Sequence, residues 1–123
     1  MKIKTIDEYG IFFDNGNTLK DYHSQDCCER VYADWTNIQV ITKINQNYID
    51  SNSLEFDEDL EKKINLIPDV GFEIESQNGI RLLVSCYNVQ NGYYSSNLEL
   101  QYVKAHPQLL TIDISHCVKD DIC

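Results

Sequence analysis

The sequence predicts an α+β fold, in which a single antiparallel, meander-rich β-sheet carries one or two short helices on a face. Two observations support this prediction. Asn-Gly pairs occur three times between segments rich in β-branched and aromatic residues, and such pairs favour the tight turns of β-hairpins. Within these segments apolar and polar residues alternate, which is the period of a strand. With 123 residues, the chain is expected to form one domain over residues 1–123.

The strands are expected in order around the three Asn-Gly pairs. Their segments are residues 9–13, 18–23, 70–75, 80–89 and 97–104. The segment 80–89 carries apolar residues on both faces, as a central strand does. Leu110, Ile112 and Ile114 alternate with polar residues and predict one more, half-buried strand.

The middle of the chain supplies the expected helix. Apolar residues recur three to four positions apart over residues 56–67, and Pro68 closes the segment. These residues are Phe56, Leu60, Ile64 and Ile67. The segment 36–44 stays open between strand and helix, because its β-branched residues favour a strand while its isoleucines have helical spacing.

Composition narrows the possible partners. The formal net charge is -10 and the pI is about 4.5, so direct binding to nucleic acid or to an anionic membrane is disfavoured. A protein partner with a basic surface fits this charge. The sequence has no apolar run long enough to span a bilayer and no signal-peptide pattern at its start. A cytoplasmic location is therefore expected, with the five cysteines reduced.

The string H-S-Q-D-C-C-E at residues 23–29 allows two chemical interpretations. The first is a structural zinc site, and the second is a thiol nucleophile. Ligands for zinc would come from His23, Cys27, Cys28, His116 and Cys117. No C-x-x-C pair is present, and nearby carboxylates raise a thiol pKa. No metal or other cofactor is therefore expected.

A structural interpretation of the same string is favoured. Asp26 is placed to cap a helix, Glu29 to complete a capping box, and Cys27 and Cys28 to fill space under the sheet. His116 follows the apolar face of the last predicted strand, so a buried, hydrogen-bonded histidine is expected there.

The string N-G-Y-Y-S at residues 91–95 predicts a turn with one displayed tyrosine. Tyr93 and Tyr94 must face opposite sides of an extended segment. An exposed tyrosine beside Ser95 has the composition of a protein-binding surface. Two aromatic residues that merely pin a hairpin would explain the string equally well.

An acidic run at residues 50–61 contains six acids and no base. Calcium is excluded, because on an EF-hand template Leu54 would occupy a ligand position and Glu55 would replace the required glycine. The run is expected to be a solvated face that could meet a basic partner. Its acidic residues are Asp50, Glu55, Asp57, Glu58, Asp59 and Glu61.

With these strings in view, the chain resembles a group of small uncharacterised proteins of bacteria and their phages. The resemblance rests on His23, Gln25, Asp26, Cys27, Cys28 and Glu29, and on residues 91–95. It implies a phage or mobile-element origin and supplies no activity. The chain departs from the group by continuing through Pro107 into another strand and a tail, where an extra contact surface is expected.

Together these features favour a non-catalytic, acidic interaction protein of a phage or mobile element. It would inhibit a host nucleic-acid-binding or defence protein, as anti-CRISPR proteins do, by mimicking an acidic backbone. One alternative is a metal- or thiol-dependent site built on His23, Cys27 and Cys28. The other alternative is a structural or assembly component. The oligomeric state stays open.

Overall fold

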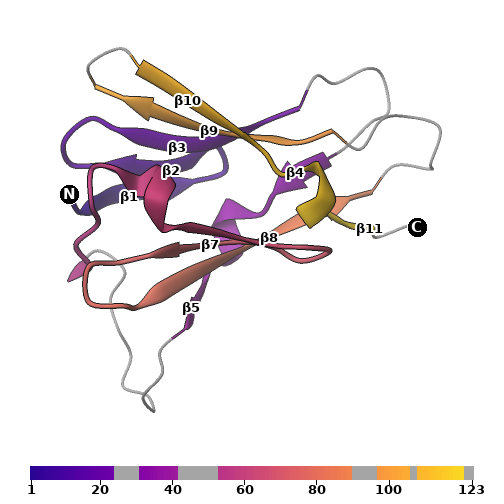
Figure 1. The fold of residues 1–123 in the computed structure, drawn as a ribbon, viewed down its shortest axis with the longest axis horizontal. Helices are drawn as coiled ribbons and strands as arrows, with labels where there is room; N and C mark the ends of the chain where they lie inside the picture. The colour runs from indigo at the N-terminus through magenta and orange to yellow at the C-terminus, as the bar shows by residue number, and fades with distance from the viewer. Residues whose placement is uncertain (24–30, 42–52, 90–96, 106–107, 121–123) are drawn as a thin grey trace.

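Two largely antiparallel sheets stack face to face in the computed structural model, which describes residues 1–23, 31–41, 53–89, 97–105 and 108–120 (Figure 1). Sheet one has the strand order β1-β2-β3-β9-β10. Its strands are β1 Ile3–Asp7, β2 Gly10–Phe13, β3 Thr18–Tyr22, β9 Glu99–Lys104 and β10 Gln108–Asp113.

Sheet two is built around β8, Arg81–Asn88, in the order β11-β8-β7-β6. β4 and β5 also pair with β8, and β11 pairs with it in parallel. The other strands are β4 Val31–Ala33, β5 Gln39–Ile41, β6 Ile64–Ile67, β7 Gly71–Glu75 and β11 Lys119–Asp120. Leu82, Val84 and Cys86 of β8 are fully buried and their neighbours half-buried, as predicted for a central strand.

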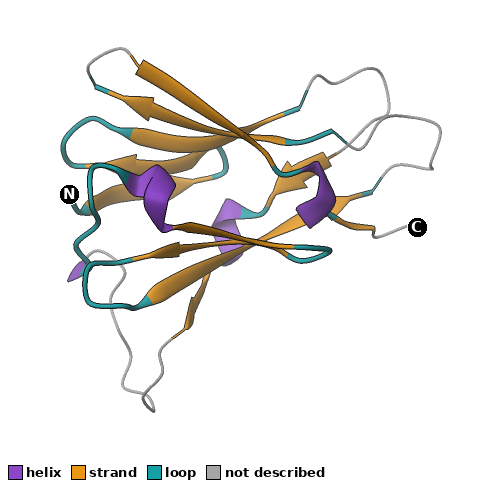
Figure 2. Cartoon of the chain, in the orientation of Figure 1, coloured by secondary structure: helices purple, strands orange, loops and turns teal. Residues whose placement is uncertain are grey.

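The predicted α+β class is wrong, because the described residues form a β-sandwich without a helix of seven or more residues. The helical turns that the structure describes in full span three or four residues each (Figure 2). They are η1 Trp35–Asn37, η3 Leu60–Lys63 and η4 Ser115–Cys117. None of the described helices could span a bilayer.

The predicted helix over residues 56–67 is replaced by η3 and β6. Pro68 does not end a helix; it precedes Asp69, whose φ of 62° and the Val70 N to Ile67 O hydrogen bond of 3.2 Å make a tight turn into β7. Proline followed by a residue of positive φ is typical of a type II turn. The apolar residues spaced three to four apart are therefore divided among the segment before η3, η3 itself and β6. The open segment 36–44 contains the end of η1 and then β5.

Two of the three predicted hairpins are confirmed. Asn15-Gly16 joins β2 to β3, and Asn78-Gly79 joins β7 to β8. In each turn only the glycine has a positive φ, 91° and 83° respectively, so both are three-residue loops with a bulged glycine and not two-residue turns.

The third predicted hairpin is wrong as a pairing of strands. β8 and β9, which flank the N-G-Y-Y-S string, belong to different sheets, and β9 pairs with β3 and β10. The physical reason is the need to cover two apolar faces. Leu100 and Tyr102 of β9 and Leu82 and Val84 of β8 are all buried. Because the described residues form no long helix that could cover these faces, the two sheets cover each other.

Aromatic side chains fill the space between the sheets. Trp35 and Phe72 meet edge to face at 5.6 Å, and Phe13 and Phe56 do so at 5.8 Å between ring centroids. All four rings are fully buried or nearly so. One hydrophobic cluster thus joins both sheets with η1 and the segment before η3.

Candidate functional site

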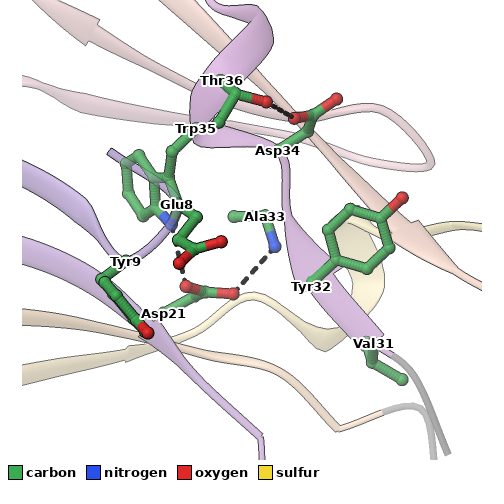
Figure 3. A pocket seen from close by; sticks show the side chains of 9 residues that line it. All are labelled: Glu8, Tyr9, Asp21, Val31, Tyr32, Ala33, Asp34, Trp35 and Thr36. Carbon is green, nitrogen blue, oxygen red and sulfur yellow. Dashed lines mark hydrogen bonds between the residues drawn. The ribbon is translucent and has the colours of Figure 1, made fainter. Parts of the chain in front are cut away.

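A pocket of about 610 Å³ opens where the β1–β2 turn, β3, β4 and η1 meet (Figure 3). We call it the tyrosine–carboxylate pocket. Three carboxylates and two tyrosines line it beside the buried indole of Trp35. The described lining residues are Glu8, Tyr9, Asp21, Val31, Tyr32, Ala33, Asp34, Trp35 and Thr36.

The β1–β2 turn brings Glu8 and Tyr9 to the pocket. The Asp7 carboxylate accepts the Tyr9 N–H at 2.8 Å, which closes the turn locally. Gly10 then begins β2 with a φ of 149°, where an added Cβ would lie 2.1 Å from the Leu19 carbonyl oxygen. The resulting turn leaves the Glu8 and Tyr9 side chains exposed, with Tyr9 68% accessible.

Asp21 of β3 connects the two sheets at the pocket. Its Oδ1 accepts the indole N–H of Trp35 at 2.8 Å, and its Oδ2 accepts the backbone N–H of Ala33 at 2.9 Å (Figure 3). Each carboxylate oxygen thus holds a part of the β4–η1 segment against sheet one. Asp21 is consequently a structural residue of the pocket with both oxygens engaged.

Glu8 and Asp34 differ from Asp21. Among the described residues, the Asp34 carboxylate accepts a hydrogen bond only from the Thr36 hydroxyl, at 2.9 Å, and Glu8 has no hydrogen bond or ion pair. No lysine or arginine is among the described residues that line the pocket. The pocket therefore presents negative charge that the described part of the chain does not neutralise.

Tyr9 and Tyr32 supply aromatic surface beside these carboxylates. Figure 3 draws the two rings on either side of Asp21. Tyr32 is half-buried, and its ring centroid lies 5.8 Å from that of Tyr87 on β8. A face built from tyrosine rings and carboxylates attracts organic cations through both ring and charge.

The acidic segment, residues 55–61, is bound to sheet one through its backbone. The Phe56 N–H donates to the Met1 carbonyl at 2.7 Å, and the buried Tyr102 hydroxyl donates to the Glu58 carbonyl at 2.7 Å. Asn17 donates to the Tyr102 oxygen at 2.8 Å. Burial raises the pKa of Tyr102 to about 12, although the Asn17 hydrogen bond opposes this shift.

Lysines of the same chain neutralise part of the acidic segment. Lys104 Nζ lies 3.1 Å from Asp59 Oδ1 and 3.7 Å from Glu61 Oε1, and Lys2 Nζ lies 3.9 Å from Glu55. The hydrogen bond and charge of Lys104 hold the pKa of Asp59 below its usual value. The same contact with Asp59 raises the pKa of Lys104. Asp57 and Glu58 are exposed, and Asp50 lies outside the described residues.

The histidines do not meet at a metal site in the described part of the chain. His23 Nδ1 is hydrogen-bonded to the Asn97 carbonyl oxygen and lines a second pocket of about 340 Å³ with Asp113 and Ser115. The prediction of a buried His116 is wrong, because His116 is exposed on η4. The strand ends at Asp113, so the period-two pattern does not continue to His116.

The described cysteines do not favour thiol chemistry. Cys86 and Cys117 are free and buried, and burial raises the pKa of both thiols, assisted by Asp21 at Cys86. No group of three or more histidine, cysteine or acidic residues that could hold a metal occurs among the residues that the structure describes.

Both sequence strings lie largely outside the described residues. Only His23 of the first string is described, and the second string is wholly outside. The residues concerned are Gln25, Asp26, Cys27, Cys28, Glu29, Tyr93, Tyr94 and Ser95. Their predicted capping, packing and display therefore stay predictions.

The sequence interpretation missed the tyrosine–carboxylate pocket. Two signals were available: the D-E-Y-G string at residues 7–10, which reads as a turn, and the D-W-T string at residues 34–36, which holds the single tryptophan. Neither pointed to the other, because residues 7–10 and 34–36 meet only through the stacking of the two sheets.

Comparison with known proteins gives a family without an activity. A family model described as a domain of unknown function, DUF7448, matches residues 1–100. No curated protein and no solved structure matches the chain. The matched residues include β1 to β8 and the start of β9, and they leave β10 and β11 outside. The chain belongs to the DUF7448 family of domains of unknown function.

Proposed function

We propose that this chain is a non-catalytic interaction protein that binds a partner protein through the tyrosine–carboxylate pocket. The observation that supports this proposal is the combination of Glu8 and Asp34, which no described cation neutralises, with an exposed tyrosine at one pocket. The partner would present a lysine or arginine side chain to this pocket.

The chemistry of the lining favours a cation on a flexible side chain. A lysine ammonium or an arginine guanidinium can pair with the Glu8 and Asp34 carboxylates while it lies against the ring of Tyr9 or Tyr32. Charge-assisted hydrogen bonds are about twice as strong as neutral ones. The net charge of -10 adds long-range attraction for a basic partner and repels nucleic acid and anionic lipid.

The wider role follows from the partner's charge and from the resemblance to phage proteins. Host proteins that bind nucleic acid carry basic grooves, and an acidic protein of a phage or mobile element could occupy such a groove in the host cytoplasm. We therefore propose inhibition of a host nucleic-acid-binding or defence protein. No bond-making step is assigned to the pocket, because both Asp21 oxygens are engaged in holding the fold.

Binding of model peptides tests the proposal. Lysine-rich, arginine-rich and glutamate-rich peptides of equal length would be titrated into the protein, with calorimetry and the fluorescence of Trp35 as readouts. Trp35 is the only tryptophan and lines the pocket. We expect the two cationic peptides to bind, with affinity falling steeply as salt increases, and the glutamate-rich peptide not to bind.

A matched pair of variants locates the binding. Glu8→Lys with Asp34→Lys should weaken binding of the cationic peptides by about tenfold or more. Asp57→Lys with Glu58→Lys makes the same change in net charge on the acidic segment and should change affinity much less. Equal losses of affinity in the two double variants would show that binding depends on net charge and not on a defined site. This outcome would contradict the assignment of binding to the pocket.

A further inference from the structure

β10 is an edge strand without the usual protection against pairing. Natural edge strands are commonly kept apart by lysine, proline, bulges or short length. Among the other edges, β1 contains a bulge between Ile3 and Thr5 and also Lys4, and β6 has only four residues. β10 has six residues in continuous register with β9, and its only charged residue is Asp113 at its end.

One hydrogen-bonding side of the β10 backbone has no partner among the described strands. The Ile114 N–H donates to the Leu98 carbonyl at 2.9 Å, in register with the β9–β10 pairs. Because hydrogen-bonded pairs alternate along antiparallel strands, Leu110 and Ile112 direct their backbone groups toward β9. Leu109, Thr111 and Asp113 direct theirs outward, where no described strand pairs with them (Figure 1).

The side chains of β10 suit an extension of the sheet. Leu110 and Ile112 pack against the core from the edge of the sandwich and remain only partly buried. On the opposite face Leu109 is 55% exposed. A strand added at this edge would cover more of these apolar side chains.

We propose that two copies of the chain pair through β10, antiparallel and about a two-fold axis at Thr111. In this register Thr111 lies opposite Thr111 of the second copy, and Leu110 lies opposite Ile112 on the core side. Leu109 lies opposite Asp113 of the second copy on the outer side. Apolar and threonine pairs of this kind stabilise antiparallel sheets, and sheet one continues across the dimer.

The open backbone groups select this register over its neighbours. The outward N–H and C=O groups of Leu109, Thr111 and Asp113 must pair with one another across the dimer, so the axis lies at one of the residues from 109 to 113. An axis at Leu110 would leave the outward groups of Asp113 without a partner in β10, and an axis at Ile112 would do the same to Leu109. An axis at Leu109 would pair only the first residues of β10. An axis at Asp113 would bring two carboxylates opposite each other, which is unfavourable. Only the Thr111 axis pairs all three outward residues, and it keeps the two Asp113 carboxylates apart.

This inference is independent of the proposed pocket function. β10 lies outside the residues matched by the family model, where the sequence suggested an extra contact surface. Copies that each carry a charge of -10 repel one another, so added salt should strengthen the dimer. Binding of a basic partner should respond to salt in the opposite direction, and the two proposals can therefore fail separately.

Opposite charge changes at Leu109 test the register. Sedimentation of the purified protein over a concentration series should give a weak monomer–dimer equilibrium of the 14.3 kDa chain. Leu109→Lys places an ammonium opposite Asp113 and should tighten the dimer by about threefold to tenfold, while Leu109→Glu should weaken it to a similar extent. Val70→Lys and Val70→Glu, at an exposed position in the turn before β7, measure the effect of charge away from the proposed interface.

A backbone variant tests the edge itself. Thr111→Pro removes an outward N–H that β9 does not use, so β10 should stay in place while the dimer is lost. Circular dichroism and thermal unfolding would establish that the variant folds. A wild-type chain that stays monomeric at high concentration and high salt would overturn the proposal. Equal effects of lysine at Leu109 and Val70 would overturn the register.

Discussion

The tyrosine–carboxylate pocket and the acidic segment are both rich in acids, but they differ in what surrounds the carboxylates. In the acidic segment, Asp59 and Glu61 face Lys104, and Glu55 faces Lys2. In the pocket, Glu8 and Asp34 have no cationic partner among the described residues. Much of the charge of the segment is therefore used within the chain, and the charge of the pocket is displayed.

This difference shows that a run of acids in a sequence does not identify a docking surface. Six acids crowd into residues 50–61, whereas the pocket collects its three carboxylates from β3, the β1–β2 turn and the residue before η1. What decides the display of charge is whether lysines elsewhere in the fold reach the acids. This difference is why we propose partner binding at the pocket and an anchoring role for the segment.

The largest expected effect is on the free energy of unfolding, and it distinguishes the structural acid Asp21 from the displayed acids Glu8 and Asp34. Asp21→Asn replaces one carboxylate oxygen with an amide NH₂ group. This group faces one of the two N–H groups that donate to Asp21 and cannot accept a hydrogen bond from it. The substitution should reduce the free energy of unfolding by about 2–4 kcal/mol, because a buried donor loses its acceptor. Urea unfolding monitored by Trp35 fluorescence measures this loss.

Glu8→Gln is the matched control, since it also removes one carboxylate from the pocket. The free energy of unfolding should change by no more than about 0.5 kcal/mol, because Glu8 is exposed and has no hydrogen bond or ion pair with another described residue. Similar losses in the two variants would contradict the distinction between structural and displayed acids.

The next effect concerns the Tyr102 hydroxyl, which holds the acidic segment against sheet one, and it appears at alkaline pH. The pKa of Tyr102 in the folded chain, about 12, exceeds the ordinary value of 10. Between these two values the unfolded chain has lost the phenolic proton and the folded chain keeps it, so stability falls as pH rises. The loss should approach about 2–3 kcal/mol between pH 10 and pH 12.

Tyr102→Phe isolates this contribution. The buried thiols of Cys86 and Cys117 also have raised pKa values and cause an alkaline loss in both proteins. The difference between wild type and variant should therefore shrink as pH rises from 10 to 12. A constant difference over this range would show that the Tyr102 hydroxyl does not control the alkaline transition.

The smallest effect concerns the lysine that neutralises the segment. Lys104→Met removes the main cause of the low pKa of Asp59, so that pKa should rise toward its ordinary value, as followed by NMR titration of the side-chain carboxyl carbon. Because the pKa is lowered in the folded chain, the contribution of Asp59 to stability is present above its unfolded pKa. It is lost as pH falls through the folded pKa.

The variant should accordingly lose less stability on acidification than the wild type. Lys63→Met, at an exposed lysine without an ion pair to any described residue, should leave the titration of Asp59 unchanged. If both variants shift the pKa of Asp59 equally, the Lys104 contact is not specific, and the contrast between segment and pocket weakens.

Local patterns predicted the strands well where a turn signal and an alternating pattern coincided. The segments around Asn15-Gly16 and Asn78-Gly79 form hairpins at the expected places. Residues 56–67 were misassigned, because apolar residues of η3, of β6 and of the segment before η3 together mimicked the spacing of one helix. The pairing of β9 with β3 and β10 could not be deduced, since it joins segments far apart in the chain.

The candidate site was harder to predict than the fold. The sequence drew attention to H-S-Q-D-C-C-E and N-G-Y-Y-S, of which only His23 is described. The pocket residues Glu8, Tyr9 and Asp34 are ordinary in type and scattered in sequence. The Asp21–Trp35 hydrogen bond that gives the pocket its shape crosses between the sheets, and no spacing rule records such a contact.

The sequence alone determined the net charge and the two described hairpin turns, because these depend on composition and on neighbouring residues. Only the tertiary structure decided which sheet each strand joins, which acids meet a lysine and which edge stays open. The physical reason is that apolar faces are buried by whichever face in the fold can cover them. Side chains from distant segments then become neighbours through packing, and local sequence does not encode which ones meet.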